Sequence, residues 1–101
     1  MNDVSEVKTM WNEWKSIPFP SDYAGEDVEG ICAVSLDTYT AGCIDTFISR
    51  KGSLDSKRIS ILKKCEKDLE IVTSKLEGEA KLYFEQLLLM TQKVLATGKL
   101  K

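Results

Sequence analysis

The chain has 101 residues, which is enough for one domain, residues 1–101, with a single modest hydrophobic core. Apolar residues make up 43% of it and charged residues 30%, proportions typical of a folded globular protein that argue against an intrinsically disordered chain. The net charge of −2 conceals a division, because residues 1–50 hold nine acids and three bases whereas residues 51–101 hold eleven bases and seven acids.

A first helix is predicted over Asp3–Ile17. Its apolar residues recur at intervals of three and four and end in Trp11 and Trp14, which places them on one helical stripe. Pro18 ends the helix, since the residue before a proline is pushed out of helical geometry. We expect the two tryptophans to hold this helix against the others; an exposed pair would instead be an anchor for a partner.

A second helix is predicted from Glu26 or Asp27 to Gly52, where glycine can adopt the left-handed conformation of a helix C-terminus. Its apolar positions run almost all round, which is typical of a buried central helix. Glycines and threonines weaken the pattern, so we expect a kink or break near Leu36. A short strand at Ile31–Leu36 is the alternative interpretation.

A third helix, capped by Ser53 or Asp55, is predicted to extend to about Leu76. Gly78 interrupts the pattern, and a fourth helix is predicted over Glu79–Ala96. The short connections require neighbouring helices to run antiparallel. The sequence therefore predicts an all-α fold, an up-and-down bundle of about four helices of which the first is shorter.

Several features exclude classes of protein. No stretch approaches the ~20 apolar residues that span a bilayer, and the N-terminus lacks the pattern of a signal peptide. Lys alternates with Glu and Asp in the second half, a pattern of solvated helix faces, so we expect no nucleic-acid binding. Cys32, Cys43 and Cys65 match no zinc or redox spacing. We expect a cytoplasmic protein, without membrane association, whose reduced cysteines pack as small apolar side chains.

The residues also offer no recognisable catalytic or metal-binding set. Histidine, the commonest general base and zinc ligand, is absent from the sequence. Glu26 and Glu29 have the i, i+3 spacing found in carboxylate-bridged metal sites, but the histidine of that motif is missing. Asp37 and Asp45 would lie about two helical turns apart, too far to share an ion. We expect neither enzymatic activity nor a metal or cofactor.

The segment from Ser16 to Ser49 contains no Lys or Arg and mixes acids with apolar residues. Such a segment attracts a basic partner at low salt; an ordinary solvated acidic face is the other interpretation. The candidate partner-binding residues are six acids and two tyrosines: Asp22, Tyr23, Glu26, Asp27, Glu29, Asp37, Tyr39 and Asp45.

Short segments over most of the chain carry a resemblance to known proteins. They are Trp11 with Trp14, Leu36-Asp37, Ala41-Gly42-Cys43-Ile44, Thr46-Phe47, Gly52, Leu54-Asp55, Arg58, Ile61-Leu62, Gly78-Glu79-Ala80 and Tyr83-Phe84. In these the chain resembles small α-helical bacterial immunity proteins of contact-dependent growth inhibition and related polymorphic toxin systems. The resemblance implies a protein that binds and neutralises a cognate toxin domain. Many such toxins are nucleases with basic, phosphate-binding active sites, which the carboxylates of an inhibitor can occupy.

The alternative function is a structural or adaptor bundle without catalytic activity. It would self-associate, for example as a homodimer, through exposed apolar residues of the third and fourth helices. Ile61, Ile71 and Met90 are the residues that motivate this alternative, because they lie beyond what one core-facing stripe requires.

Overall fold

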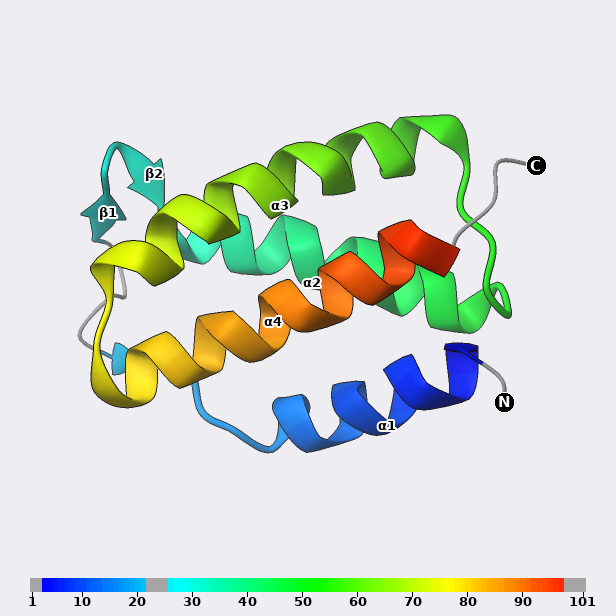
Figure 1. Ribbon diagram of the computed structural model, residues 1–101, viewed down its shortest axis with the longest axis horizontal. Helices are drawn as coiled ribbons and strands as arrows, with labels where there is room; N and C mark the ends of the chain where they lie inside the picture. Colours follow the sequence, from blue (N-terminus) through cyan, green and yellow to red (C-terminus); the bar gives the residue numbers. More distant parts are fainter. Residues whose placement is uncertain (1–2, 22–25, 98–101) are drawn as a thin grey trace.

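The computed structural model describes residues 3–21 and 26–97. The elements follow in the order α1 (Asp3–Lys15), β1 (Asp27–Val28), β2 (Ile31–Cys32), α2 (Ala33–Ser49), α3 (Ser56–Lys75) and α4 (Gly78–Thr97). The helices run along the long axis and alternate in direction (Figure 1). This confirms the predicted all-α bundle, in which α1, with 13 residues, is the shortest helix.

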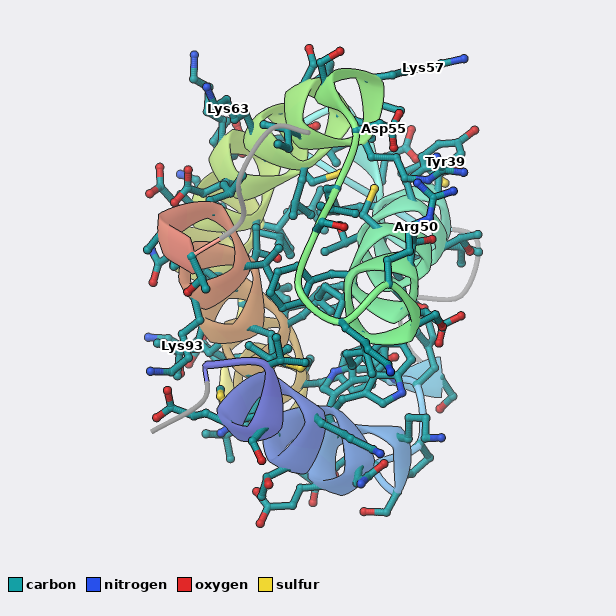
Figure 2. All side chains as sticks on the ribbon, turned by 90° about the vertical axis from the view of Figure 1, so that its right-hand side faces the viewer. Tyr39, Arg50, Asp55, Lys57, Lys63 and Lys93 are labelled. Carbon is teal, nitrogen blue, oxygen red and sulfur yellow. The ribbon has the colours of Figure 1, made fainter. Side chains whose placement is uncertain are left out.

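The four helices form a diamond in cross-section. Seen end-on in Figure 2, α1 and α3 lie on opposite sides, with α2 and α4 between them. Helices α2 and α4 contact each other and both of the outer helices. Leu62 and Leu69 of α3, Phe47 of α2 and Phe84 of α4 are all fully buried. The core therefore lies between the four helices, and α2, which was predicted to be the central helix, contacts all three of the others.

Helix α1 is fastened to α4 by aromatic side chains. Trp14 is buried, and its Nε1 donates a hydrogen bond to the carbonyl oxygen of Tyr83 at 3.2 Å. The Trp14 ring lies 5.1 Å from that of Tyr83 and 5.4 Å from that of Trp11, centroid to centroid. Phe19, just after α1, meets Tyr83 and Phe84 edge-on. The packing role expected of the tryptophans is confirmed for Trp14, while Trp11 is half-buried.

The start of α2 departs most from the prediction. The helix expected from Glu26 or Asp27 begins only at Ala33, and an antiparallel β-hairpin occupies the preceding residues. Val28 pairs with Ile31, and the two residues between them, Glu29 and Gly30, have φ values of 54° and 80°. Positive φ at both central residues defines a type I′ turn and is incompatible with a helix. The alternative strand is confirmed for Ile31–Cys32 only. The break expected near Leu36 is not found, because α2 passes through that residue as one helix from Ala33 to Ser49.

The end of α2 is a Schellman motif. The amide of Gly52 donates to the carbonyl of Phe47 at 2.9 Å, and the amide of Lys51 donates to that of Ile48 at 3.1 Å. Lys51, with φ 56°, takes the left-handed position that was predicted for the glycine, and Gly52 follows with φ 100°. A Cβ on Gly52 would lie 2.7 Å from Cγ2 of Val4 in α1. Gly52 is thus required by the close approach of α1 as well as by its own conformation.

The remaining helix boundaries lie within two residues of the predicted ones. Asp55 is the N-cap of α3 and Leu76 its C-cap residue. Gly78, with φ 65°, is the first residue of α4 instead of the residue before it. Helix α1 ends at Lys15, two residues before the predicted Ile17.

Candidate protein-binding surfaces

One end of the bundle carries a group of exposed carboxylates. Glu26, Asp27 and Glu29 are exposed on or beside the hairpin, and Glu77 and Glu79 are exposed at the α3–α4 connection. Figure 1 shows the hairpin, this connection and the start of α4 at the same end of the long axis. Among the residues that the structure describes, no Lys or Arg forms an ion pair with any of the five. We call these five residues the acidic end.

Glu77 and Glu79 were not among the predicted binding residues. They are far from the hairpin in the sequence and belong to the Lys-rich half of the chain. The signal that locates them is topological, because in an up-and-down bundle the start of the second helix and the turn between the third and fourth meet at one end. Asp22 and Tyr23, which were predicted, lie outside the described residues.

A hollow of about 870 Å³ lies beside the acidic end. Its walls come from Pro18, Phe19 and Pro20 after α1 and from Leu82 at the start of α4, and Glu79 is at its edge. Leu82 is 60% exposed. An apolar side chain of a partner that enters such a hollow would be surrounded by apolar atoms, with carboxylates close by.

Asp37, also a predicted binding residue, is engaged within the fold. Its Oδ1 accepts a hydrogen bond from the Tyr83 hydroxyl at 2.8 Å, which links α2 to α4. Burial raises the pKa of Asp37, and the hydrogen bond from Tyr83 offsets part of that rise. Burial and the nearby carboxylate together raise the pKa of the Tyr83 phenol. The structure thus gives Asp37 a role in holding the two central helices together.

Tyr39 and Asp45, the other two predicted residues on α2, are exposed but separate from the acidic end. Asp45 is twelve residues after Ala33, the first residue of α2, or about 18 Å along the helix axis. Tyr39 is 63% exposed and stands above the junction of α2 and α3. The predicted residues that the structure describes are therefore divided among the acidic end, the interior and the outer face of α2.

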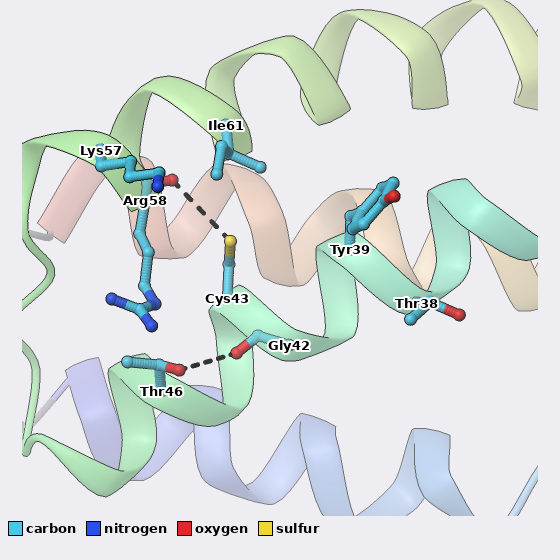
Figure 3. A pocket seen from close by; sticks show the side chains of 8 residues that line it. All are labelled: Thr38, Tyr39, Gly42, Cys43, Thr46, Lys57, Arg58 and Ile61. Carbon is cyan, nitrogen blue, oxygen red and sulfur yellow. Dashed lines mark hydrogen bonds between the residues drawn. The ribbon is translucent and has the colours of Figure 1, made fainter.

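A groove runs between α2 and α3 beneath Tyr39. One hollow of about 420 Å³ lies near the start of α3 (Figure 3), and a second of about 530 Å³ lies nearer the hairpin. Tyr39 and Ile61 line both hollows, so the two are adjacent, and both of these side chains are exposed. We call this feature the α2–α3 groove.

The two walls of the α2–α3 groove differ in charge. The α2 wall offers uncharged groups, among them Gly42 and Thr46, whose hydroxyl donates to the Gly42 carbonyl at 2.9 Å. The α3 wall carries the cations, which are Lys57, Arg58 and Lys64. Two of them have acidic neighbours, since Arg58 pairs with Asp55 at 2.9 Å and Lys64 with Asp68 at 3.2 Å. Lys57 forms no ion pair with any described residue.

The cysteines line the same region. Cys43 and Cys65 are free and buried, and burial raises the pKa of both thiols, which confirms the expectation of packing cysteines for these two. Cys32 is half-buried at the N-cap of α2, where hydrogen bonds from Ser35 and from the amide of Val34 lower its pKa. Among the described residues, no three side chains of the metal-binding types come together.

Comparison with known proteins finds no match to a protein-family model, to a curated protein or to a solved structure. Within residues 3–21 and 26–97, no helix has both the length and the apolar character needed to cross a bilayer. The functional interpretation therefore depends on the charges and shapes of the surfaces described above.

Proposed function

We propose that this protein is a stoichiometric inhibitor of the immunity type, which binds a toxin domain and covers a basic site on it with the acidic end. One observation supports this proposal: two segments distant in the sequence bring five exposed carboxylates to one end of the bundle. None of the five has a cationic partner in the described part of the chain. A nuclease that binds phosphate presents Lys and Arg, and complementary charge speeds its encounter with an acidic surface. Such an inhibitor acts by covering the site and needs no catalytic residue of its own.

The dimensions of the bundle are compatible with this role. The molecule measures 37 × 25 × 18 Å, so the end face alone spans roughly 25 by 18 Å. A standard interface buries about 800 Å² on each partner, which requires the end face together with its flanks. The hollow between Pro20 and Leu82 lies on such a flank and would receive an apolar anchor of the partner.

The test begins with capture of the partner by the tagged protein from its own cells and purification of the captured polypeptide. Association rates are then measured by stopped flow at low and at physiological ionic strength for wild type and for the triple variant Glu26→Gln, Asp27→Asn, Glu29→Gln. We expect association at least about tenfold slower for the variant at low salt, and a smaller difference at high salt, because salt screens exposed charges.

A control variant removes the same number of charges elsewhere, with Glu6→Gln, Asp45→Asn and Glu66→Gln. We expect it to associate within about threefold of the wild-type rate, since Glu6 lies near the start of α1, Asp45 near the end of α2 and Glu66 in the middle of α3, all of them away from the acidic end. Co-expression with the captured polypeptide should restore growth for the wild type and less so for the acidic-end variant. Equal rates for the two triple variants would reject the acidic end as the binding surface.

A self-associating adaptor bundle is the second candidate function. Ile61 and Ile71 are exposed on α3, and Leu82 and Leu89 are exposed on α4. The two leucines are seven residues apart and so lie on one helical stripe. Met90, which contributed to this hypothesis, is fully buried and cannot take part.

Sedimentation velocity over a wide concentration range tests this second function. Self-association through α4 predicts a dimer that the double variant Leu82→Ser, Leu89→Ser converts to monomer. A monomer at every concentration would reject it.

A further inference from the structure

We propose that the α2–α3 groove is a second binding site, separate from the acidic end. Its occupant is an extended acidic peptide segment of a protein partner, and this segment places an apolar side chain against Tyr39 and Ile61. The charge of the groove walls, its length and a glycine that the fold does not require all support this occupant. The site does not depend on the function proposed above, because it uses other residues and the opposite charge.

The first argument is the presence of a glycine, Gly42, within helix α2 at the groove. Glycine within a helix is less favourable than any residue except proline, so its presence needs a reason. The fold supplies none: Gly42 is not among the glycines with positive φ, and a Cβ built on it would meet no atom within 4 Å. Gly42 instead lines the groove between Tyr39 and Thr46, where its missing side chain deepens the channel (Figure 3). An occupant from outside this chain would use that space.

The charges specify the chemistry of the occupant. Lys57, Arg58 and Lys64 follow one another along the α3 wall. Within residues 3–21 and 26–97, Asp55 and Asp68 are the only carboxylates that form ion pairs with them. The α2 wall adds no charged side chain to either hollow. The three cations exceed the two carboxylates by one positive charge, and Lys57 is the cation that has no ion pair among the described residues. A carboxylate of a ligand would therefore meet an unmatched cation on this wall. A nucleic acid is disfavoured, because so short a patch would contact few phosphates.

The shape specifies an extended chain. The lining residues of α3 extend from Lys57 to Asp68, eleven residues apart, or about 16 Å along the helix. About five residues of extended peptide cover that length at roughly 3.3 Å each. A channel open to solvent between two helices suits a chain that passes along it, whereas small molecules are usually enclosed. Tyr39 and Ile61, at the point where the hollows meet, are the amphipathic and apolar contacts for an anchoring side chain.

The experiment screens random 12-residue peptides displayed on phage for binding to the wild-type protein. Peptides that also bind the variant Gly42→Gln are removed. Glutamine is a better helix former than glycine and projects into the groove, so this variant should melt no lower than wild type while blocking the channel. We expect the enriched peptides to carry Asp or Glu on both sides of an apolar or aromatic residue. A synthetic copy of the most enriched peptide is the probe for fluorescence anisotropy and for amide chemical-shift mapping.

The variants separate the possible results. We expect the variant Gly42→Gln to bind the probe peptide at least about tenfold more weakly than wild type does. We expect the same of the double variant Lys57→Glu, Lys64→Glu. Ser49→Gln on the exposed end of α2 and the acidic-end triple variant should leave its affinity unchanged. Shifted amides should include those of Gly42, Thr46 and Ile61.

Other results would overturn the proposal. These are failure of any peptide to be enriched, enrichment of basic peptides, and equal binding to wild type and Gly42→Gln. A dimer in sedimentation that Gly42→Gln dissociates would also overturn it, because the occupant would then be a second copy of this chain. None of these results bears on the acidic end, which has its own test with the captured polypeptide.

Discussion

The two ends of the bundle are built from similar connections but differ in packing and in charge. Each has a glycine with positive φ, Gly52 in the α2–α3 connection and Gly78 at the first position of α4. Gly52 lies against Val4, whereas a Cβ on Gly78 would meet nothing within 4 Å. The charges differ in the same way, since Asp55, after Gly52, pairs with two arginines whereas the carboxylates of the acidic end have no cationic partner among the described residues.

The difference shows where a small bundle can present a binding surface. At the α2–α3 connection, helix α1 lies against Gly52, and the carboxylate of Asp55 is paired with arginines of the molecule itself. At the acidic end a Cβ on Gly78 would meet no atom within 4 Å, so a substitution at this glycine is limited by backbone conformation alone. Unpaired charges of one sign repel one another, and a partner of opposite sign would relieve that repulsion.

The largest expected effect comes from placing a methyl group at each of the two glycines. Gly52→Ala should lower the free energy of unfolding by about 3 kcal/mol, because strain at positive φ adds about 1–2 kcal/mol to the clash with Val4. Gly78→Ala should lower it by only about 1–2 kcal/mol, since the conformational strain acts alone there. Urea denaturation of both variants measures the difference. Equal losses would show that α1 does not restrict the α2–α3 connection.

Tyr83→Phe tests the internal support of α2 and α4, and we expect a loss of about 1–2 kcal/mol at neutral pH. The loss should shrink in acid. Because burial raises the pKa of Asp37, this carboxyl favours the folded state below its usual titration range, and the benefit is lost as the pH rises through the raised pKa. Removing the Tyr83 donor matters most where the carboxylate is charged.

The matched variant Asp37→Asn keeps an acceptor for the Tyr83 hydroxyl but cannot titrate. It should therefore gain stability relative to wild type as the pH rises from about 4 to about 7. Denaturation curves of the two variants and wild type at several pH values test both expectations. A pH-independent difference between Asp37→Asn and wild type would contradict them.

Lys51→Gly should stabilise the protein slightly. Lys51 holds the left-handed position of the Schellman motif at φ 56°, a conformation that glycine adopts without steric cost. We expect a gain of about 1 kcal/mol, reduced by the greater freedom that glycine gives to the unfolded chain. Lys51→Ala, which retains the strain, is the control in the same thermal melts and should not raise the melting temperature.

The smallest expected effect is that of Asp55→Asn. Asparagine remains a good N-cap, so the variant mainly loses the exposed ion pairs with Arg50 and Arg58. The bond from Arg58 lowers the pKa of Asp55, so its contribution is present above the usual carboxyl range and is lost as the pH falls through the lowered pKa. This direction is opposite to that of Asp37. The melting temperature of the variant should be below that of wild type at low salt and equal to it at high salt.

The residues show why the fold was more predictable than the site. The stripe of Leu62, Leu69 and Val72 is local and periodic, and the structure buries all three. The hairpin has two-residue strands, too short for an alternating pattern, and its turn is Glu29-Gly30 in place of the usual Asn-Gly or Asp-Gly. Its apolar residues also fit the helix that follows.

The site depends on contacts between distant segments. The exposed acids of the hairpin were predictable from composition, because nothing nearby in the sequence neutralises them. The bond between Asp37 and Tyr83 joins residues 46 positions apart, and no local pattern announces it. The α2–α3 groove exists only once two helices lie side by side. Gly42 offered one hint, as a helix-weakening residue whose neighbours in the fold were not yet known.

The placement of the aromatic residues has a consequence for spectroscopy. Both tryptophans of the chain lie on α1, and Trp14 is in contact with Tyr83 of α4. Intrinsic fluorescence therefore reports the contact between α1 and α4, while far-ultraviolet circular dichroism reports the helices as a whole. If α1 detaches before the other three helices unfold, the emission will shift to longer wavelength at a lower temperature than the ellipticity changes.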